Sequence, residues 1–98
     1  ARTKRDLRSQ ELGNEVAEAW ISLKAARDVE KLLRENQLPQ AEIGFQTALR
    51  SYELGRSEMV DVLQSEQQVW KSHIELVKVV FEQQVRLAEL ETLVGGAL

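Results

Sequence analysis

Cysteine is absent from this chain of 98 residues, so disulfides and thiolate-bound metal sites are excluded. Only one proline and five glycines are present, which leaves room for long helices. No stretch approaches the roughly 20 consecutive apolar residues of a membrane-spanning helix, so we predict no membrane insertion. Excess positive charge is also missing, because the net charge is −3 at pH 7. Without a basic field to neutralise phosphates, we predict no binding to nucleic acid.

Alanine, glutamate, glutamine, leucine, lysine and arginine dominate the chain, a composition typical of long helices and coiled coils. Hydrophobic residues make up 43% and charged residues 30%, which suits a soluble, folded helical chain. A chain of this length forms at most one domain. We therefore predict an all-α fold, an antiparallel two-helix coiled-coil hairpin that spans residues 1–98.

The first predicted helix runs from about residue 7 to residue 53 and carries one apolar face. Residues on this face recur at the three- and four-residue steps of a helix, and they include Val16, Trp20, Leu23, Ala26, Val29 and Leu33. Pro39 has no backbone N–H and crowds the preceding turn. Because strong helix formers flank it, we predict a kink at Pro39 and not a linker.

The second predicted helix, residues 58–94, carries two adjacent apolar seams. The first follows a heptad spacing and consists of Val69, His73, Leu76, Val80, Gln83, Leu87, Leu90 and Val94. The second consists of Trp70, Ile74, Val77 and Phe81. One seam can pack on the first helix, whereas the other needs a helix that this chain does not supply. We predict that Gly95-Gly96 ends the second helix.

The two helices are separated by a predicted tight turn at residues 54–57. Gly55 suits the left-handed position just past a helix end, where a side chain would clash. Ser57 suits the N-cap of the second helix, with its hydroxyl accepting from free amides of the next turn. Glu58 and Asp61 then place negative charge at the positive end of the helix dipole.

No combination of residues in the sequence indicates an enzyme. We find no Ser/His/Asp arrangement, no phosphate-binding glycine loop and no metal-ligand spacing. His73 is the only histidine, and we interpret it as a packed seam residue and not a metal ligand. We interpret Trp20 and Trp70 as packing anchors and not as ligand-stacking residues. We therefore predict no catalytic residue, no cofactor and no bound metal.

Three segments have the order and spacing of a known family. The first is L-P-Q-A-E ahead of A-L-R-S-Y-E-L-G-R-S-E-M-V-D-V-L-Q-S-E-Q-Q-V, which contains the turn. The second is E-V-A-E-A-W-I-S-L-K-A-A-R before it, and the third is L-A-E-L-E-T-L-V-G-G at the end of the second helix. Together they cover about residues 15–96. This pattern resembles the outer membrane efflux protein family, the TolC-like channel components of export pumps.

The resemblance implies that the chain is the second helical hairpin of a channel protomer, and thus a fragment of a longer protein. In that family, three protomers build a tunnel of helices that hangs from an outer-membrane β-barrel. The implied location is the periplasmic portion of a Gram-negative outer-membrane protein. The implied partners are two further copies of the full-length protein, the hairpin of the periplasmic adaptor and, indirectly, the inner-membrane pump.

The resemblance also assigns roles to residues 52–61, which it places at the periplasmic entrance. Tyr52 falls on the position of an aromatic latch residue that helps to hold the entrance shut. The family's basic latch residue would fall on Ser57, whereas the arginine here is Arg56, one residue earlier. The implied gating residues are Tyr52 and Arg56. The implied adaptor-binding residues are Gly55, Arg56, Ser57, Val60, Asp61 and Val62.

Two other functions also fit a helical hairpin. One is the hairpin of the periplasmic adaptor itself, for which Arg50, Leu54 and Ser57 have the right residue types at separations that are too short. The other is a generic helical scaffold, which would tolerate substitutions at the turn as long as the chain folds.

Overall fold

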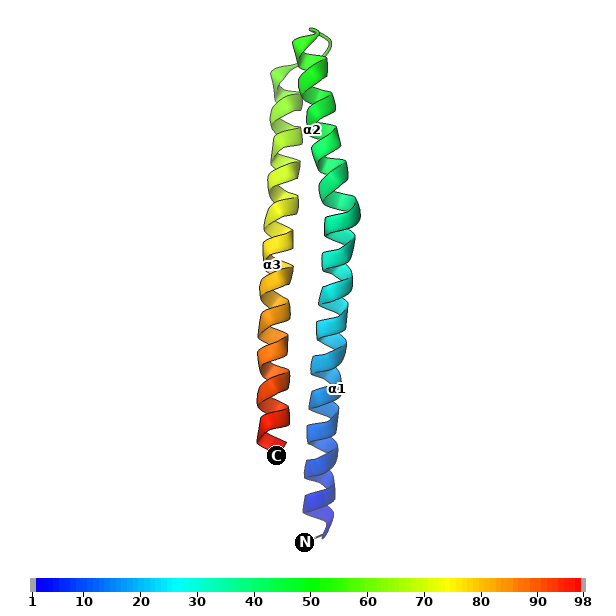
Figure 1. Cartoon of the computed structure of the whole chain (residues 1–98), viewed down its shortest axis with the longest axis vertical. Helices are drawn as coiled ribbons and strands as arrows, with labels where there is room; N and C mark the ends of the chain where they lie inside the picture. Colours follow the sequence, from blue (N-terminus) through cyan, green and yellow to red (C-terminus); the bar gives the residue numbers. More distant parts are fainter. Residues whose placement is uncertain (1, 98) are drawn as a thin grey trace.

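The computed structural model describes residues 2–97, which form a long antiparallel helical hairpin (Figure 1). The first arm (residues 2–53) consists of α1 (Arg2–Leu32), the π-helical turn η1 (Leu33–Gln37) and α2 (Leu38–Glu53). The second arm is α3 (Met59–Ala97), which returns beside the first, so that both ends of the hairpin lie away from its tip. The described residues contain no strand and extend over 78 × 18 × 15 Å. The predicted all-α hairpin is confirmed.

The helices extend further than the sequence predicted. The first arm begins at Arg2, and α3 continues to Ala97. The prediction that Gly95-Gly96 ends the second helix is therefore wrong. Of the glycines in the described residues, only Gly55 has a positive φ, so Gly95 and Gly96 follow the helix. Glycine lowers helix stability by only about 1 kcal/mol relative to alanine, which the preceding turns can offset.

The first arm passes Pro39 without leaving the helix, and the turn before it is the wide one. The Leu38 N–H donates to the Leu33 carbonyl, five residues back, where an α-helix would use the residue four back. Pro39 then lies in the first turn of α2 and offers no N–H donor to the preceding turn. The helix thus adjusts to Pro39 through η1.

The arms pack through one heptad seam on α3, which we call the inner seam. Its members are buried or half-buried and recur at steps of three and four: Val62, Ser65, Val69, Ser72, Leu76, Val79, Gln83, Arg86, Leu90 and Leu93. The matching positions on the first arm are Leu12, Val16, Ala19, Leu23, Ala26, Glu30 and Leu33, then Leu38, Ala41, Phe45 and Ala48. A cluster of Ala26, Leu33 and Val79, with Leu76 packed against it, lies near the middle of the hairpin.

The inner seam corrects half of the predicted one. Val69, Leu76, Gln83 and Leu90 do lie in it, but the positions between them are taken by the residues just before those predicted. His73, Leu87 and Val94 are exposed, while Ser72, Arg86 and Leu93 face the first arm. Trp20 and Val29 on the first arm are likewise exposed. The physical reason is that the apolar stripe on α3 is wider than one seam. The first arm packs only against the residues along one edge of this stripe.

Four residues of the inner seam are polar, and three of them, Ser65, Ser72 and Arg86, meet part of their hydrogen-bonding needs on their own helix. The Ser72 hydroxyl, which is 2% exposed as a residue, donates to the Gln68 carbonyl at 3.0 Å. The Arg86 guanidinium reaches Glu89 at 3.2 Å and Glu82 at 3.8 Å, while its buried Nε has no partner among the described residues. These polar members conceal the seam from a search for apolar periodicity.

Candidate functional site

The first arm ends at the tip in a Schellman motif. The Gly55 N–H donates to the Tyr52 carbonyl at 2.9 Å, and the Arg56 N–H donates to the Ser51 carbonyl at 2.9 Å. Gly55 has φ 72°, so its predicted left-handed conformation is confirmed. No heavy atom would lie within 4 Å of an added Cβ there. The requirement for glycine therefore comes from the backbone conformation and not from lack of space.

The second arm begins one residue later than Ser57 as N-cap would place it, so the predicted N-cap is wrong. Since α3 begins at Met59, Glu58 is the N-cap residue. Its N–H donates to Asp61 Oδ2 at 3.2 Å, which is one half of a capping box. The Ser57 hydroxyl instead donates to the Ala48 carbonyl across the tip, at 3.5 Å. Asp61 consequently has a structural role of its own, in addition to the favourable position of its charge at the helix start.

The tip exposes a group of apolar side chains, which we call the tip surface: Leu54, Met59, Val60 and Leu63. Of these, the resemblance had singled out only Val60. Met59 stands out in the sequence as an apolar residue at a turn that polar residues would satisfy, and the same signal could have found Leu54 and Leu63. Val62 is different, because it is only 4% exposed and lies in the inner seam. Its side chain adds nothing to the tip surface.

The implied gating residues lie at the same end of the hairpin. Tyr52 is 43% exposed, and Arg56 is exposed as well. Within the described residues, neither side chain makes a hydrogen bond or an ion pair. Both can therefore bond to groups outside this hairpin.

A second exposed apolar surface runs along α3, which we call the outer seam: Trp70, Ile74, Val77 and Phe81. These side chains are 63, 51, 68 and 69% exposed, respectively. They recur at steps of four, three and four, and therefore form a second helical stripe beside the inner seam. Among the described residues, no helix of the hairpin buries this stripe. Trp70 is thus not a packing anchor within the hairpin.

A polar layer connects the two arms near the middle of the hairpin. The Gln83 amide donates to one carboxylate oxygen of Glu30, and Arg34 Nε donates to the other at 2.6 Å. The hydrogen bond from Gln83, followed by the hydrogen bond from Arg34, lowers the pKa of Glu30 from its ordinary value of 4.5. Gln83 and Glu30 are both seam residues, so this layer favours one alignment of the arms over a shifted one.

The lowered pKa of Glu30 predicts a pH-dependent contribution to stability. Because the folded-state pKa lies below the unfolded value of about 4.5, the contribution is complete above that pH and is lost as the pH falls through the folded value. Melting temperatures measured between pH 7 and pH 3 should therefore fall further for the natural chain than for Gln83→Leu. Glu75→Gln, at an exposed position, serves as the control and should keep the natural pH dependence. Equal losses in the natural chain and Gln83→Leu would contradict the assignment.

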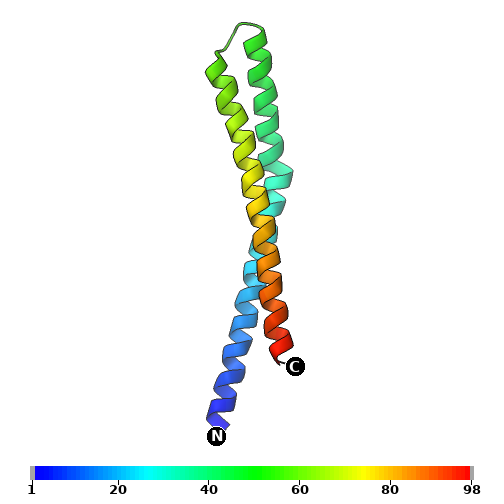
Figure 2. The ribbon, with the colours of Figure 1, turned by 90° about the vertical axis from the view of Figure 1, so that its left-hand side faces the viewer.

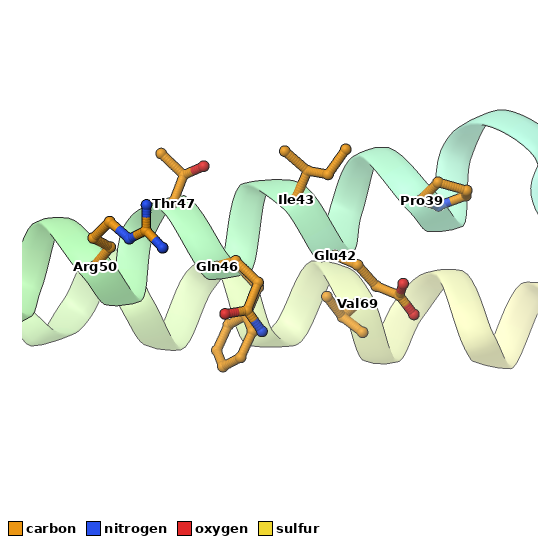
Figure 3. Close-up of a pocket in the computed structure, with 8 residues that line it drawn as sticks. Pro39, Glu42, Ile43, Gln46, Thr47, Arg50 and Val69 are labelled. Carbon is orange, nitrogen blue, oxygen red and sulfur yellow. The ribbon is translucent and has the colours of Figure 1, made fainter.

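A shallow groove lies on the side of the hairpin nearer the tip (Figure 3). Most of its lining comes from α2, including Pro39, Ile43 and Arg50, while Val69 reaches it from α3. Figure 3 shows no side chains that converge on one point in this groove. It offers no nucleophile beside a base and no enclosed volume for a substrate.

Neither a metal site nor a membrane span is found in the parts of the chain that the structure describes. No group of three or more His, Cys, Asp or Glu side chains could hold a metal ion there. None of the helices described combines the length and the apolar character that crossing a bilayer requires.

Comparison with known proteins identifies the family of the chain. The family model described as "Outer membrane efflux protein" matches residues 1–96, which include both arms and the tip. No curated protein and no solved structure matches the chain. The family is one of efflux channel components. The chain belongs to the outer membrane efflux protein family.

Proposed function

We propose that this hairpin is part of the periplasmic tunnel wall of a trimeric outer-membrane export channel. The observation that carries the proposal is the outer seam, a second apolar stripe on a helix that already packs through its inner seam. A helix in a closed wall has a neighbour on either side, so it needs two packing stripes. A free-standing hairpin needs only one. The full-length protein would then be the outer-membrane component of a Gram-negative efflux pump, with this hairpin in the periplasm.

We further propose that the tip docks the hairpin of the periplasmic adaptor. The tip surface supports this role, because four large apolar side chains are exposed where solvent would favour polar residues. Gly55, Arg56, Ser57 and Asp61 lie at the same turn, where the side chains of Arg56, Ser57 and Asp61 add polar groups beside the tip surface. The inner-membrane pump is then reached only through the adaptor.

Tyr52 and Arg56 are proposed to close the entrance. The Tyr52 hydroxyl can donate or accept a hydrogen bond, and the Arg56 guanidinium can only donate. Since neither has a side-chain partner within the described hairpin, acceptors on neighbouring hairpins of the channel are available to them. Docking of the adaptor at the adjacent tip surface would compete with these contacts and open the entrance.

The docking proposal is tested by Gly55→Val. A side chain in the left-handed conformation costs about 1–2 kcal/mol, so the Schellman turn should rearrange. If docking needs the natural turn, affinity for the adaptor should fall about tenfold, the factor that 1.4 kcal/mol corresponds to. Adaptor capture by the immobilised channel protein and export from cells would both be measured.

Gly44→Val is the matched control, because Gly44 lies in α2 and its added Cβ would meet no atom within 4 Å. It should leave adaptor capture unchanged. Natural capture and export by the Gly55→Val channel would favour a passive helical scaffold and would rule out docking through this turn.

A further inference from the structure

The first arm contains one residue more than the three- and four-residue steps of its seam require. Its seam positions step regularly through Ala26, Glu30 and Leu33, and again from Leu38 onward. Between Leu33 and Leu38, however, the step is five residues. In an α-helix a fifth residue would turn Leu38 about 100° away from the seam. The wide turn η1 absorbs this residue, so that both parts of the arm face α3.

The two parts of the arm on either side of η1 are held differently. The stem side has the buried residues Leu23, Ala26 and Leu33, together with the polar layer between Glu30 and Gln83. On the tip side, α2 has no buried residue at all. Burial of apolar side chains is the main contribution to helix packing, so α2 itself contributes less buried apolar surface to the packing of the arms than α1 does, although Val62 of α3 is buried on that side.

The backbone at the junction is also the weakest in the arm. Pro39 cannot donate a hydrogen bond to the preceding turn, and η1 replaces regular α-helical bonds by a five-residue bond. Leu33, the first residue of η1, is buried in the core cluster, whereas Arg34, Glu35, Asn36 and Gln37 are exposed, so movement that begins after Leu33 requires no repacking of the core. In the view of Figure 2 the arms cross near the middle of the hairpin and diverge toward both ends.

We propose that η1 is a hinge at which the tip part of the first arm, α2, moves relative to the fixed stem, α1. The extra residue gives the arm two ways to complete the turn, with hydrogen bonds to the fourth or to the fifth residue back. Exchange between them rotates α2 without breaking the stem. This inference rests on the proposed function, in which the tip must move for the entrance to open.

The test restrains the hinge in two independent ways in the full-length channel protein. Deletion of Asn36 removes the extra residue and lets the seam continue as an α-helix, while Pro39→Ala restores the missing N–H. Deletion of Asp28, an exposed residue of α1 with no wide turn of its own, is the matched control. Amide hydrogen exchange over residues 33–42, trimer formation, adaptor capture and export would be measured.

In the natural protein, exchange should be faster over residues 33–42 than over residues 19–30. Both hinge variants should form trimers and capture the adaptor, with exchange over residues 33–42 slowed about fivefold, as expected for one added backbone hydrogen bond. Export should fall in both, because the tip no longer moves. Deletion of Asp28 should instead prevent assembly, since it turns the stem residues out of the seam.

Three results would overturn the hinge. They are equally slow exchange on both sides of η1 in the natural protein, full export by variants whose exchange has slowed, and equal tolerance of the Asn36 and Asp28 deletions. If the Asn36 deletion prevents assembly, hydrogen exchange and export measured on Pro39→Ala still test the hinge. Failure of the docking proposal is separate, because it would appear as natural adaptor capture by Gly55→Val, while the exchange measurement reports on the hinge alone.

Discussion

Replacement of Phe81 by glutamate is expected to abolish assembly of the channel while leaving the hairpin itself folded. Phe81 is 69% exposed in the hairpin, so an isolated chain loses little packing. In the proposed wall, the same position is covered by a neighbouring helix. A carboxylate buried there without a partner costs several kcal/mol, and a trimer would contain three of them. The substitution should therefore affect assembly and not folding, because the outer seam is exposed in the hairpin and buried only in the proposed wall.

Trimer formation by the full-length protein would be measured by size-exclusion chromatography, and helicity of the 98-residue chain by circular dichroism. Lys78→Glu changes the charge at an exposed position of α3 outside the outer seam, and should leave the trimer intact. Normal trimers of Phe81→Glu would mean that the outer seam faces water in the assembled protein. The wall proposal would then be wrong.

Leu23→Ala is expected to produce the largest loss of stability within the hairpin. Leu23 is 2% exposed and is the largest fully buried side chain in the described part of the chain. Its truncation should lower the free energy of unfolding by about 2–5 kcal/mol, because apolar burial is lost and a cavity is left. For a chain of this size, each kcal/mol lowers the melting temperature by about 4–8 °C.

Thermal unfolding followed by circular dichroism measures this effect. Ile21→Ala, two residues away, is the matched control because Ile21 is 65% exposed. It should change stability by no more than about 0.5 kcal/mol. Similar melting temperatures for the two variants would show that the arms do not pack along the inner seam.

The hairpin and its tip were predictable because each depends on local chemistry. Gly55 marks the reversal, since glycine alone accepts a positive φ without cost. The outer seam was also visible, as a stripe of large apolar residues at helical spacing. The N-cap could not be predicted from residue type, which favours serine at this position. The chain continues through Ser57 after the Schellman turn, so that Glu58 is the residue that caps α3.

The choice of the inner seam could not be settled from periodicity. Steps of three and four through Val69 and Leu76 fit both His73 and Ser72 as the residue between them. Apolar content favoured the series that contains Leu87 and Val94, whereas the arms pack through Arg86 and Leu93. Only the position of the partner arm decides which margin of a wide stripe is buried.

The wide turn η1 shows the same limit. Pro39 signals a disturbance of the helix, but proline accounts equally well for a bend and for an added residue. The added residue is recognised only by comparing seam positions on both sides of the turn, Leu33 and Leu38. That comparison needs the correct seam first.

The most direct test of the account is a structure of the full-length channel bound to its periplasmic adaptor, determined by cryo-electron microscopy. In that structure the tip surface should contact the adaptor hairpin, and the outer seam of α3 should be buried against a neighbouring hairpin of the channel. An adaptor bound away from residues 54–63, with Trp70 and Phe81 facing solvent, would contradict it.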